Sequence, residues 1–314
     1  MSTIIELRNL THRYGSLTAV NDISLQIEEG SIFGFIGPNG AGKTTTMRIL
    51  ATLLRPTSGD ARVGGCSALK DPRGVRQQIG YMPDFFGVYN EMTVWEYLDF
   101  FAACYHIPAS RRRGMIDDLL QLVDLEHRRG DYVDSLSRGM KQRLCLARTL
   151  AHDPKVLILD EPASGLDPRA RIEILELLRE LQAMGKTIFF SSHILLEVAE
   201  ICTTIGIIEA GKLVACGSLD EIQSHQHARR VTISVTGREE QALELVRSVP
   251  GVLDVQVAGR GERIALQVDF EGGDDRQAAI LARLVQSGVP VVGFEEAKIE
   301  LEDVFMQVTR GIVT

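Results

Sequence analysis

GPNGAGKTT, residues 37–45, is the segment that decides the fold of this chain. It matches the pattern G-x-x-x-x-G-K-[S/T] from Gly37 to Thr44, it follows the apolar run IFGFI, and a helical pattern continues it. A loop of this kind wraps a phosphate group with backbone N–H groups. We therefore predict a nucleotide-binding loop in which Lys43 brings positive charge to the β- and γ-phosphates and Thr44 offers its hydroxyl to Mg²⁺. The residues expected to contact the nucleotide are Gly37, Pro38, Asn39, Gly40, Ala41, Gly42, Lys43, Thr44 and Thr45.

Two carboxylates follow another apolar run, in VLILDEP at residues 156–162. Each feature has a plainer explanation when it is taken alone. Acidic residues often end strands, as in residues 156–162, and residues 37–45 could be a glycine-rich turn without a ligand. Together in one parallel sheet, the two features instead indicate a hydrolytic nucleotide site. Asp160 is then expected to hold Mg²⁺, and Glu161 to polarise a water molecule for attack on the γ-phosphate.

A second candidate anion site lies at LSRGMKQRL, residues 136–144. Here a Ser-x-Gly turn precedes an amphipathic helix, and small residues leave the N–H groups of a helix start open to an anion. The chain therefore presents two phosphate-binding helix starts that are almost a hundred residues apart.

Composition narrows the class of protein. The chain has 314 residues, 45% of them hydrophobic and 24% charged, which suits a full core and two domains. Its net charge of −8 offers no general attraction for nucleic acid. The start MSTIIELRNL lacks the pattern of a signal peptide, and no run of 18 apolar residues occurs, so we expect a cytoplasmic protein. The 5 cysteines show no CxxC spacing, which disfavours a disulfide or zinc framework.

The patterns along the chain predict an α/β protein with an added domain. Short apolar runs and glycine turns indicate strands up to about residue 86, and helical patterns dominate from about 87 to 151, where Thr93 and Glu96 form a capping-box signature. Strands and helices then alternate as in a parallel sheet. After the polar junction QSHQHARR, in which His225 and His227 are read as a solvated loop, the order β-α-β-β-α-β predicts a small ferredoxin-like domain closed by a helix in LEDVFMQVT.

Five motifs in order, namely GPNGAGKT, LSRGMKQR, LILDEP, SGLD and the histidine of SSH, resemble those of the ABC ATPase family over residues 1 to about 222. The resemblance implies a parallel core sheet, an antiparallel β subdomain and a helical subdomain at about 87–151. It places the nucleotide-binding domain at residues 1–224 and an accessory domain at 225–314. The cofactors that it implies are ATP and Mg²⁺.

Further site residues rest on the resemblance alone. Tyr14 is similar to the aromatic residue that stacks on adenine, and His193 to the switch that senses the γ-phosphate. Ser137 and Gly139 resemble the signature-loop contacts to the γ-phosphate, and Asp167 lies in the loop that communicates across a dimer. In this family two copies pair head to tail, so that each ATP lies between the phosphate loop of one chain and the signature loop of the other. The two helix starts would then belong to different sites.

Two departures from the family pattern concern the site. The signature LSRGM lacks the usual second glycine and glutamine, and we expect the Arg138 side chain to point away from a contact that the backbone makes. In GYMPDFF, Asp84 stands where the family normally has glutamine. Because Mg²⁺ favours an ionised oxygen ligand, we assign Asp84 the same role toward the metal and the attacking water.

The partners are also implied by resemblance. The aromatic-rich segment FFGVYNEMTVWEYLDFFAACY is expected to fill the helical subdomain in part and to form a docking groove for a membrane subunit in part. The ending IELEDVFMQVTRG resembles ATPase subunits of ABC-2-type exporters. We expect a subunit that energises a separate membrane permease, works as a dimer of itself, binds no nucleic acid and lies at the inner face of the membrane. The alternatives are an ABC ATPase that acts on ribosomes or DNA and a non-catalytic binding module.

Overall fold

The computed structural model describes residues 2–85, 87, 89, 91–224, 228–259, 263–297, 301, 302, 305 and 309. The chain forms two compact units, and the division between them follows Leu219. The first unit has two sheets and the second has one, and each unit has its own buried apolar cluster.

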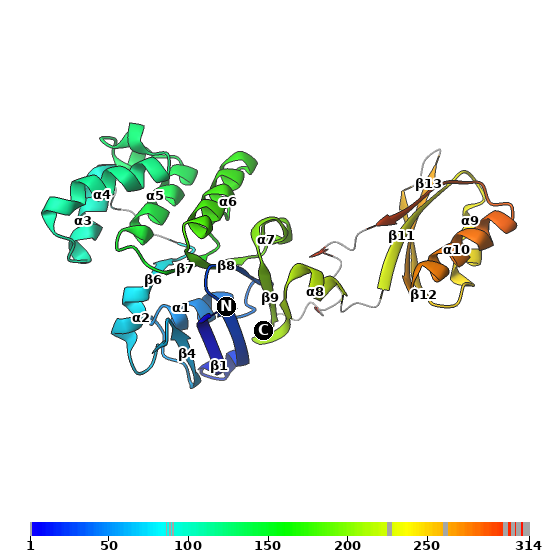
Figure 1. Ribbon diagram of the computed structural model, residues 1–314, viewed down its shortest axis with the longest axis horizontal. Coiled ribbons are helices and arrows are strands. Elements are labelled where there is room, and N and C mark those ends of the chain that lie inside the picture. The colour runs from blue at the N-terminus through cyan, green and yellow to red at the C-terminus, as the bar shows by residue number, and fades with distance from the viewer. Residues whose placement is uncertain are drawn as a thin grey trace. The chain divides into compact units, whose positions relative to one another are not determined.

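A sheet of six strands organises the first unit (Figure 1). Its order is β10-β9-β3-β8-β7-β6, and the strands from β9 to β6 run parallel to their neighbours. The strands are β3 (Ile32–Ile36), β6 (Ile79–Met82), β7 (Val156–Asp160), β8 (Thr187–Ser192), β9 (Thr204–Glu209) and β10 (Lys212–Gly217). Every residue of β3, β7 and β8 is buried, which explains their uninterrupted apolar runs. Because these strands are parallel, their carboxyl ends meet at one edge.

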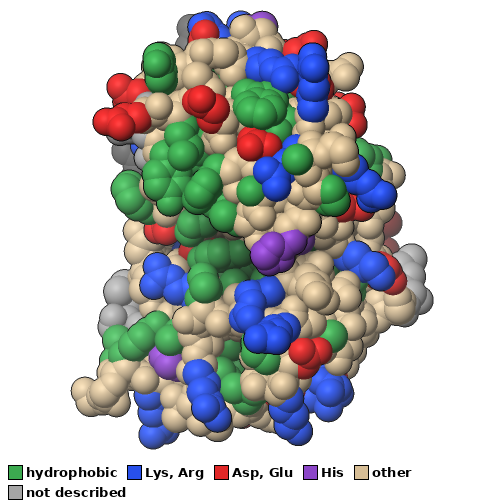
Figure 2. Space-filling view, turned by 90° about the vertical axis from the view of Figure 1, so that its left-hand side faces the viewer, with side chains coloured by type: hydrophobic (Ala, Val, Ile, Leu, Met, Phe, Trp, Pro, Cys, Tyr) green, Lys and Arg blue, Asp and Glu red, His purple; other side chains and the backbone are tan. Residues whose placement is uncertain are grey.

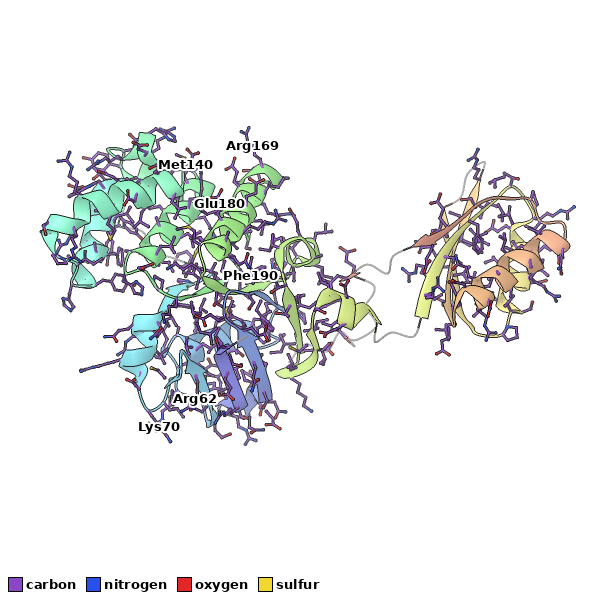
Figure 3. The ribbon with its side chains drawn as sticks, viewed as in Figure 1. Arg62, Lys70, Met140, Arg169, Glu180 and Phe190 are labelled. Atoms are coloured by element: carbon purple, nitrogen blue, oxygen red, sulfur yellow. The ribbon has the colours of Figure 1, made fainter. Side chains whose placement is uncertain are left out.

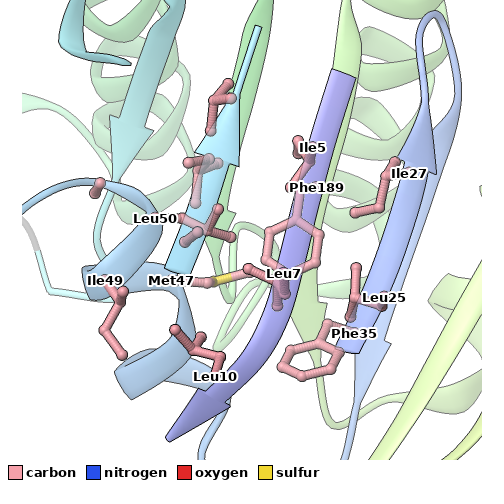
Figure 4. Close-up of a cluster of buried hydrophobic side chains, with 14 of the residues drawn as sticks. Ile5, Leu7, Leu10, Leu25, Ile27, Phe35, Met47, Ile49, Leu50 and Phe189 are labelled. Atoms are coloured by element: carbon pink, nitrogen blue, oxygen red, sulfur yellow. The ribbon is translucent and has the colours of Figure 1, made fainter. Parts of the chain in front are cut away.

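A second, antiparallel sheet packs on this framework. Its order is β2-β1-β4-β5, with β1 (Thr3–Tyr14), β2 (Leu17–Glu28), β4 (Ser58–Val63) and β5 (Cys66–Ser67). Helix α1 (Lys43–Leu50) contributes to the same core, and α2 (Pro72–Gln78) begins at the capping residue Asp71. Figure 4 shows how the apolar side chains of β1, β2 and α1 meet those of the central sheet around Phe35 and Phe189. This core places the loop before α1 against both sheets.

Helices make up most of residues 94–150. They are α3 (Val94–Cys104), α4 (Ala109–Leu122) and α5 (Arg138–Leu150), with two short 3₁₀ turns, η1 (Glu126–Arg128) and η2 (Val133–Ser135). The predicted capping box is present, because Thr93 and Glu96 hydrogen-bond reciprocally at the start of α3. Helices α6 (Pro168–Ala183) and α7 (Leu195–Ile201) follow β7 and β8. In the part of the chain that the structure describes, no helix combines the length and the apolar character needed to cross a bilayer.

The second unit has the predicted ferredoxin-like order. After α8 (Leu219–Ser224) come β11 (Ala228–Val235), α9 (Glu239–Arg247), β12 (Val252–Gly259), β13 (Ile264–Glu271), α10 (Asp274–Gln286) and β14 (Val291–Ala297). The sheet order is β12-β13-β11-β14, and all its neighbouring strands are antiparallel. The predicted fold class is thus confirmed for both units. His225, His227 and most of the expected last helix lie outside the described residues.

Candidate nucleotide-binding site

The loop between β3 and α1 leaves a helix start open. Helix α1 begins at Lys43, and the preceding residue, Gly42, has a φ of 108° and makes no side-chain cap. A Cβ atom at Gly42 would fall 2.4 Å from the carbonyl oxygen of Ala19, so both the backbone angle and the close approach require glycine. The first N–H groups of α1 therefore have no side-chain acceptor, which suits an anion.

Lys43 turns back over this loop. Its Nζ atom donates to the carbonyl oxygens of Gly37 at 2.5 Å and of Pro38 at 3.3 Å, and it lies 3.7 Å from Glu161 Oε1. Burial lowers the pKa of Lys43, while the carboxylates of Glu161 and Asp160 act in the opposite direction. The ammonium group is thus held by backbone carbonyls and a carboxylate at the mouth of the loop.

Asp160 ends β7 and is fully buried. Its Oδ1 atom accepts a hydrogen bond of 2.7 Å from Ser191 Oγ, whereas Oδ2 is buried without a hydrogen-bond partner among the described residues. Burial raises the pKa of Asp160, and the nearby hydroxyls of Ser191 and Thr44 counteract this. A buried carboxylate oxygen without a partner is costly unless a cation satisfies it, so this donor set fits Mg²⁺.

Glu161 and His193 form a pair beside Lys43. Glu161 has a φ of 53°, a left-handed conformation that is uncommon outside glycine, and its side chain is only 15% exposed. Its Oε2 atom lies 2.6 Å from His193 Nδ1, which follows β8. Lys43 and His193 therefore orient both oxygens of one carboxylate.

Ser191 was missed by the sequence reasoning. Its Oγ atom donates to Asp160 and accepts 2.9 Å from the backbone N–H of Glu161. The strand register pairs Asp160 with Ser191 on neighbouring strands. A polar residue at the end of an apolar strand that adjoins β7 was the available signal.

Asp84 follows β6 at the same edge of the sheet. Its Oδ1 atom accepts a 2.7 Å hydrogen bond from the N–H of Phe85, and its negative charge contributes to the raised pKa of Asp160. Phe85 itself is 83% exposed. Asp84 thus lies at the same edge of the sheet as Asp160 and lines the phosphate-loop pocket.

One pocket of about 480 Å³ collects these residues. Its lining combines the phosphate loop, the segments just beyond the carboxyl ends of β6, β7 and β8, and the start of α5: Pro38, Asn39, Gly40, Ala41, Gly42, Lys43, Thr44, Thr45, Asp84, Phe85, Arg138, Glu161, Ser164 and His193. Tyr14, Ser137 and Gly139 are not among the lining residues. Tyr14 is 46% exposed, and its ring meets that of His12 edge-on at 4.5 Å.

The second helix start faces a separate pocket of about 290 Å³. Ser137 caps α5 by accepting a 3.3 Å hydrogen bond from the N–H of Met140. Asp167 caps α6 by accepting from the N–H groups of Arg169 and Ala170. Figure 3 labels Met140 and Arg169 near each other at the starts of α5 and α6, and both line this pocket. Ser137 and Gly139 therefore lie in a different pocket from the phosphate loop, and Arg138 between them lines both pockets.

The aromatic segment at residues 85–105 contains both buried and exposed rings. On the face of the molecule drawn in Figure 2, hydrophobic side chains gather among charged ones. Tyr97 is fully buried, whereas Tyr89 is 51% and Phe100 is 39% exposed. The rings of Tyr89 and Phe100 meet edge-on at 5.5 Å. Phe86 lies outside the described residues. A cluster of partly exposed rings therefore covers the start of the helical region.

Two family models match the chain: "ABC transporter" over residues 20–164, and "ATP-binding protein DrrA1-3-like, C-terminal domain" over 217–309. The bacitracin transport ATP-binding protein of Bacillus licheniformis is 35% identical, with 99% of each chain covered. The Nod factor export ATP-binding protein I of Ralstonia nicotianae is 34% identical, over 98% of this chain and 94% of the relative.

A solved ATP-binding cassette, described as the dimeric structure of a post-hydrolysis state bound to ADP and Pi, aligns with a TM-score of 0.63 at 25% identity. The alignment covers 69% of this chain and 99% of that structure. The chain therefore belongs to the family of ABC transporter ATP-binding proteins and is an ATPase subunit.

Proposed function

We propose that this chain powers export through a separate membrane permease of the ABC-2 type, as a dimer that holds two ATP molecules with Mg²⁺. The observation that carries the proposal is one pocket at the strand ends, which the phosphate loop lines together with Glu161, His193 and Asp84, next to the strand that ends in the buried Asp160. The functional domains proposed are residues 1–224, with a helical subdomain at 87–151, and 225–314. The division after Leu219 supports a boundary in this region.

Each side chain in the pocket has a role that follows from its chemistry. Lys43 would exchange its carbonyl partners for the β- and γ-phosphate oxygens, and the open N–H groups of α1 would hold the β-phosphate. Glu161 would accept the proton of the attacking water, while His193 keeps the carboxylate oriented. Asp160 Oδ2 and the Thr44 hydroxyl would hold Mg²⁺, with Asp84 as an added oxygen ligand. The metal ion, when bound, supplies charge neutralisation between the β- and γ-phosphates.

The separation of the two pockets supports a shared site. Ser137 and Gly139 line a pocket that contains no residue of the phosphate loop, so these two residues would not contact the nucleotide held by the phosphate loop of their own chain. A head-to-tail pair of chains would set each such helix start against the other chain's ATP. The similar cassette described as dimeric is consistent with this arrangement.

A permease partner at the inner face of the membrane is supported by the names of the relatives, one a transport protein and one an export protein. The exposed rings around Tyr89 and Phe100 offer an apolar contact area for it. The net charge of −8 disfavours a nucleic acid partner. Recovery of the chain with a permease from detergent-solubilised membranes tests this partner, and recovery on ribosomes or DNA would favour the alternative function.

Glu161→Gln tests the shared site. The substitution keeps the size of the side chain and removes its basicity, so hydrolysis should stall while ATP remains bound. Sedimentation of this variant should then shift from monomer to dimer on addition of ATP. Gly139→Asp on the same background should reverse the shift, because its carboxylate would face the γ-phosphate.

The control for Gly139→Asp is ATP binding by the monomer, which should persist because Gly139 lies outside the phosphate-loop pocket. A dimer fraction that responds neither to ATP nor to the Gly139 change, both in the isolated chain and in the solubilised complex, would contradict the shared site.

A further inference from the structure

Arg138 is common to both pockets. It is the first residue of α5, it stands between Ser137 and Gly139, and it lines the phosphate-loop pocket as well as the pocket at the starts of α5 and α6. No other residue lines both of these pockets in the part of the chain that the structure describes. Arg138 therefore borders both pockets.

The side chain is held on the loop that leads to α6. Arg138 Nη2 donates a hydrogen bond of 3.1 Å to the carbonyl oxygen of Ser164. The guanidinium packs directly on Gly165, where an added Cβ atom would fall 2.5 Å from Arg138 Cζ. Gly165 has a φ of 68°, so glycine serves both the turn and the close approach of the arginine.

The hydrogen bond to Ser164 holds the Arg138 side chain toward the end of the pocket where Glu161 lies. The N–H of Ser164 donates 3.1 Å to the carbonyl oxygen of Glu161, so Ser164 bridges the backbone of Glu161 and the guanidinium. Ser164, Glu161 and Arg138 line the same pocket. In the proposed binding mode this end of the pocket receives the γ-phosphate.

Arg138 forms no ion pair with an acidic side chain in the part of the chain that the structure describes. Within the described residues, no Asp or Glu oxygen lies within 4.0 Å of its guanidinium, and the bond to Ser164 uses one of its N–H donors. A guanidinium with open donors matches the oxygens of a terminal phosphate better than any other side chain does.

We propose that the Arg138 side chain binds the γ-phosphate of the ATP in its own chain's pocket, while Ser137 and Gly139 on either side of it serve the ATP of the partner. The inference rests on the proposed function and adds a nucleotide-binding residue to it. Arg138 would make the pocket prefer a triphosphate to a diphosphate before any dimer forms.

The experiment is equilibrium binding of AMP-PNP and of ADP, each with Mg²⁺, to the full chain at a concentration at which sedimentation shows a monomer. Arg138→Gly and Arg138→Gln should weaken AMP-PNP binding about tenfold, as expected for one charge-assisted contact, and leave ADP binding within about twofold. Arg138→Lys should fall between them and the unmodified chain, because it keeps the charge without the fork.

Arg111→Gly is the matched control. Arg111 also lies exposed in the first turn of a helix of the same region, α4, and lines neither pocket, so this change removes one charge and adds one helical glycine without touching the site. It should bind both nucleotides as the unmodified chain does.

Unchanged AMP-PNP binding in both Arg138→Gly and Arg138→Gln overturns the inference, and so does an equal loss of both nucleotides. Lys43→Ala separates this result from failure of the proposed function. If Lys43→Ala binds both nucleotides normally, the phosphate-loop assignment is wrong; if it loses both and the Arg138 variants do not discriminate, only the role of Arg138 is wrong.

Discussion

The two helix starts that the sequence offers to phosphate differ in what occupies their N–H groups. Helix α1 follows Gly42, whose left-handed backbone brings no capping side chain, and the charged groups of Lys43 and Asp160 are buried beside it. Helix α5 follows Ser137, whose hydroxyl already accepts from the N–H of Met140, and the residue is exposed. The first start lies in a pocket that Glu161 and His193 also line, whereas Ser137 and Gly139 line a pocket that holds no residue of the phosphate loop. Two helix starts that look alike in the sequence can therefore differ in whether their N–H groups are open to an anion.

The largest expected effect is on the ATPase rate, which should depend on the first helix start far more than on Lys141 near the second. Lys43→Ala should lower the ATPase rate by at least about a hundredfold, because the β- and γ-phosphates lose the buried cation of their own pocket. Steady-state phosphate release measures this. Lys141→Ala, in α5, is the control: its Nζ atom bonds the carbonyl oxygen of Asp134, and it should retain most of the rate. Near-normal turnover in Lys43→Ala would remove the distinction between the two starts.

Two glycine-to-alanine substitutions, one at each helix start, compare the two starts by their effect on the free energy of unfolding. Gly42→Ala should lower the free energy of unfolding by about 2 kcal/mol, because it forces a side chain into a left-handed angle against the backbone of Ala19. Gly139→Ala should change it by less than about 1 kcal/mol, since its added Cβ atom meets the Cβ of Ala170 at 3.2 Å and the position is helical. Urea denaturation of both variants gives the two values. Equal losses would mean that the first loop is no more constrained than the second.

The smallest expected effect concerns the buried carboxylate of Asp160, at the end of β7 near the first helix start. Burial raises the pKa of Asp160, so ionisation of this carboxyl group opposes folding. Below the ordinary pKa of aspartate the group is protonated in both the folded and the unfolded chain, and folding carries no such cost. As the pH rises through the raised pKa, the free energy of unfolding falls. Asp160→Asn does not titrate. It should therefore resist urea better than the unmodified chain at pH 7 without nucleotide, and the two curves should converge as the pH falls toward 4. A pH-independent difference would show that Asp160 is not destabilised by burial.

Much of the candidate site could be predicted because its residues lie in short continuous segments of the sequence. The loop at residues 37–45 and the pair Asp160–Glu161 follow apolar runs that form parallel strands, and parallel strands end at one edge. Ser191 was not predicted, since its role depends on the register that sets it opposite Asp160. The direction of the Arg138 side chain was equally out of reach, because it depends on how closely α5 approaches Gly165.

By itself the sequence determined the local features of this protein: the phosphate loop, the capped starts of α3, α5 and α6, and the strand and helix order of both units. These depend on backbone preferences and side chains within a few residues of one another. Only the tertiary structure decided which residues line the pocket of the phosphate loop, which line the pocket of Ser137 and Gly139, and that Arg138 lines both. Those facts depend on the packing of segments that are far apart in the chain, where distances of a few ångströms between α5, the loop before α6 and the edge of the sheet set which groups meet.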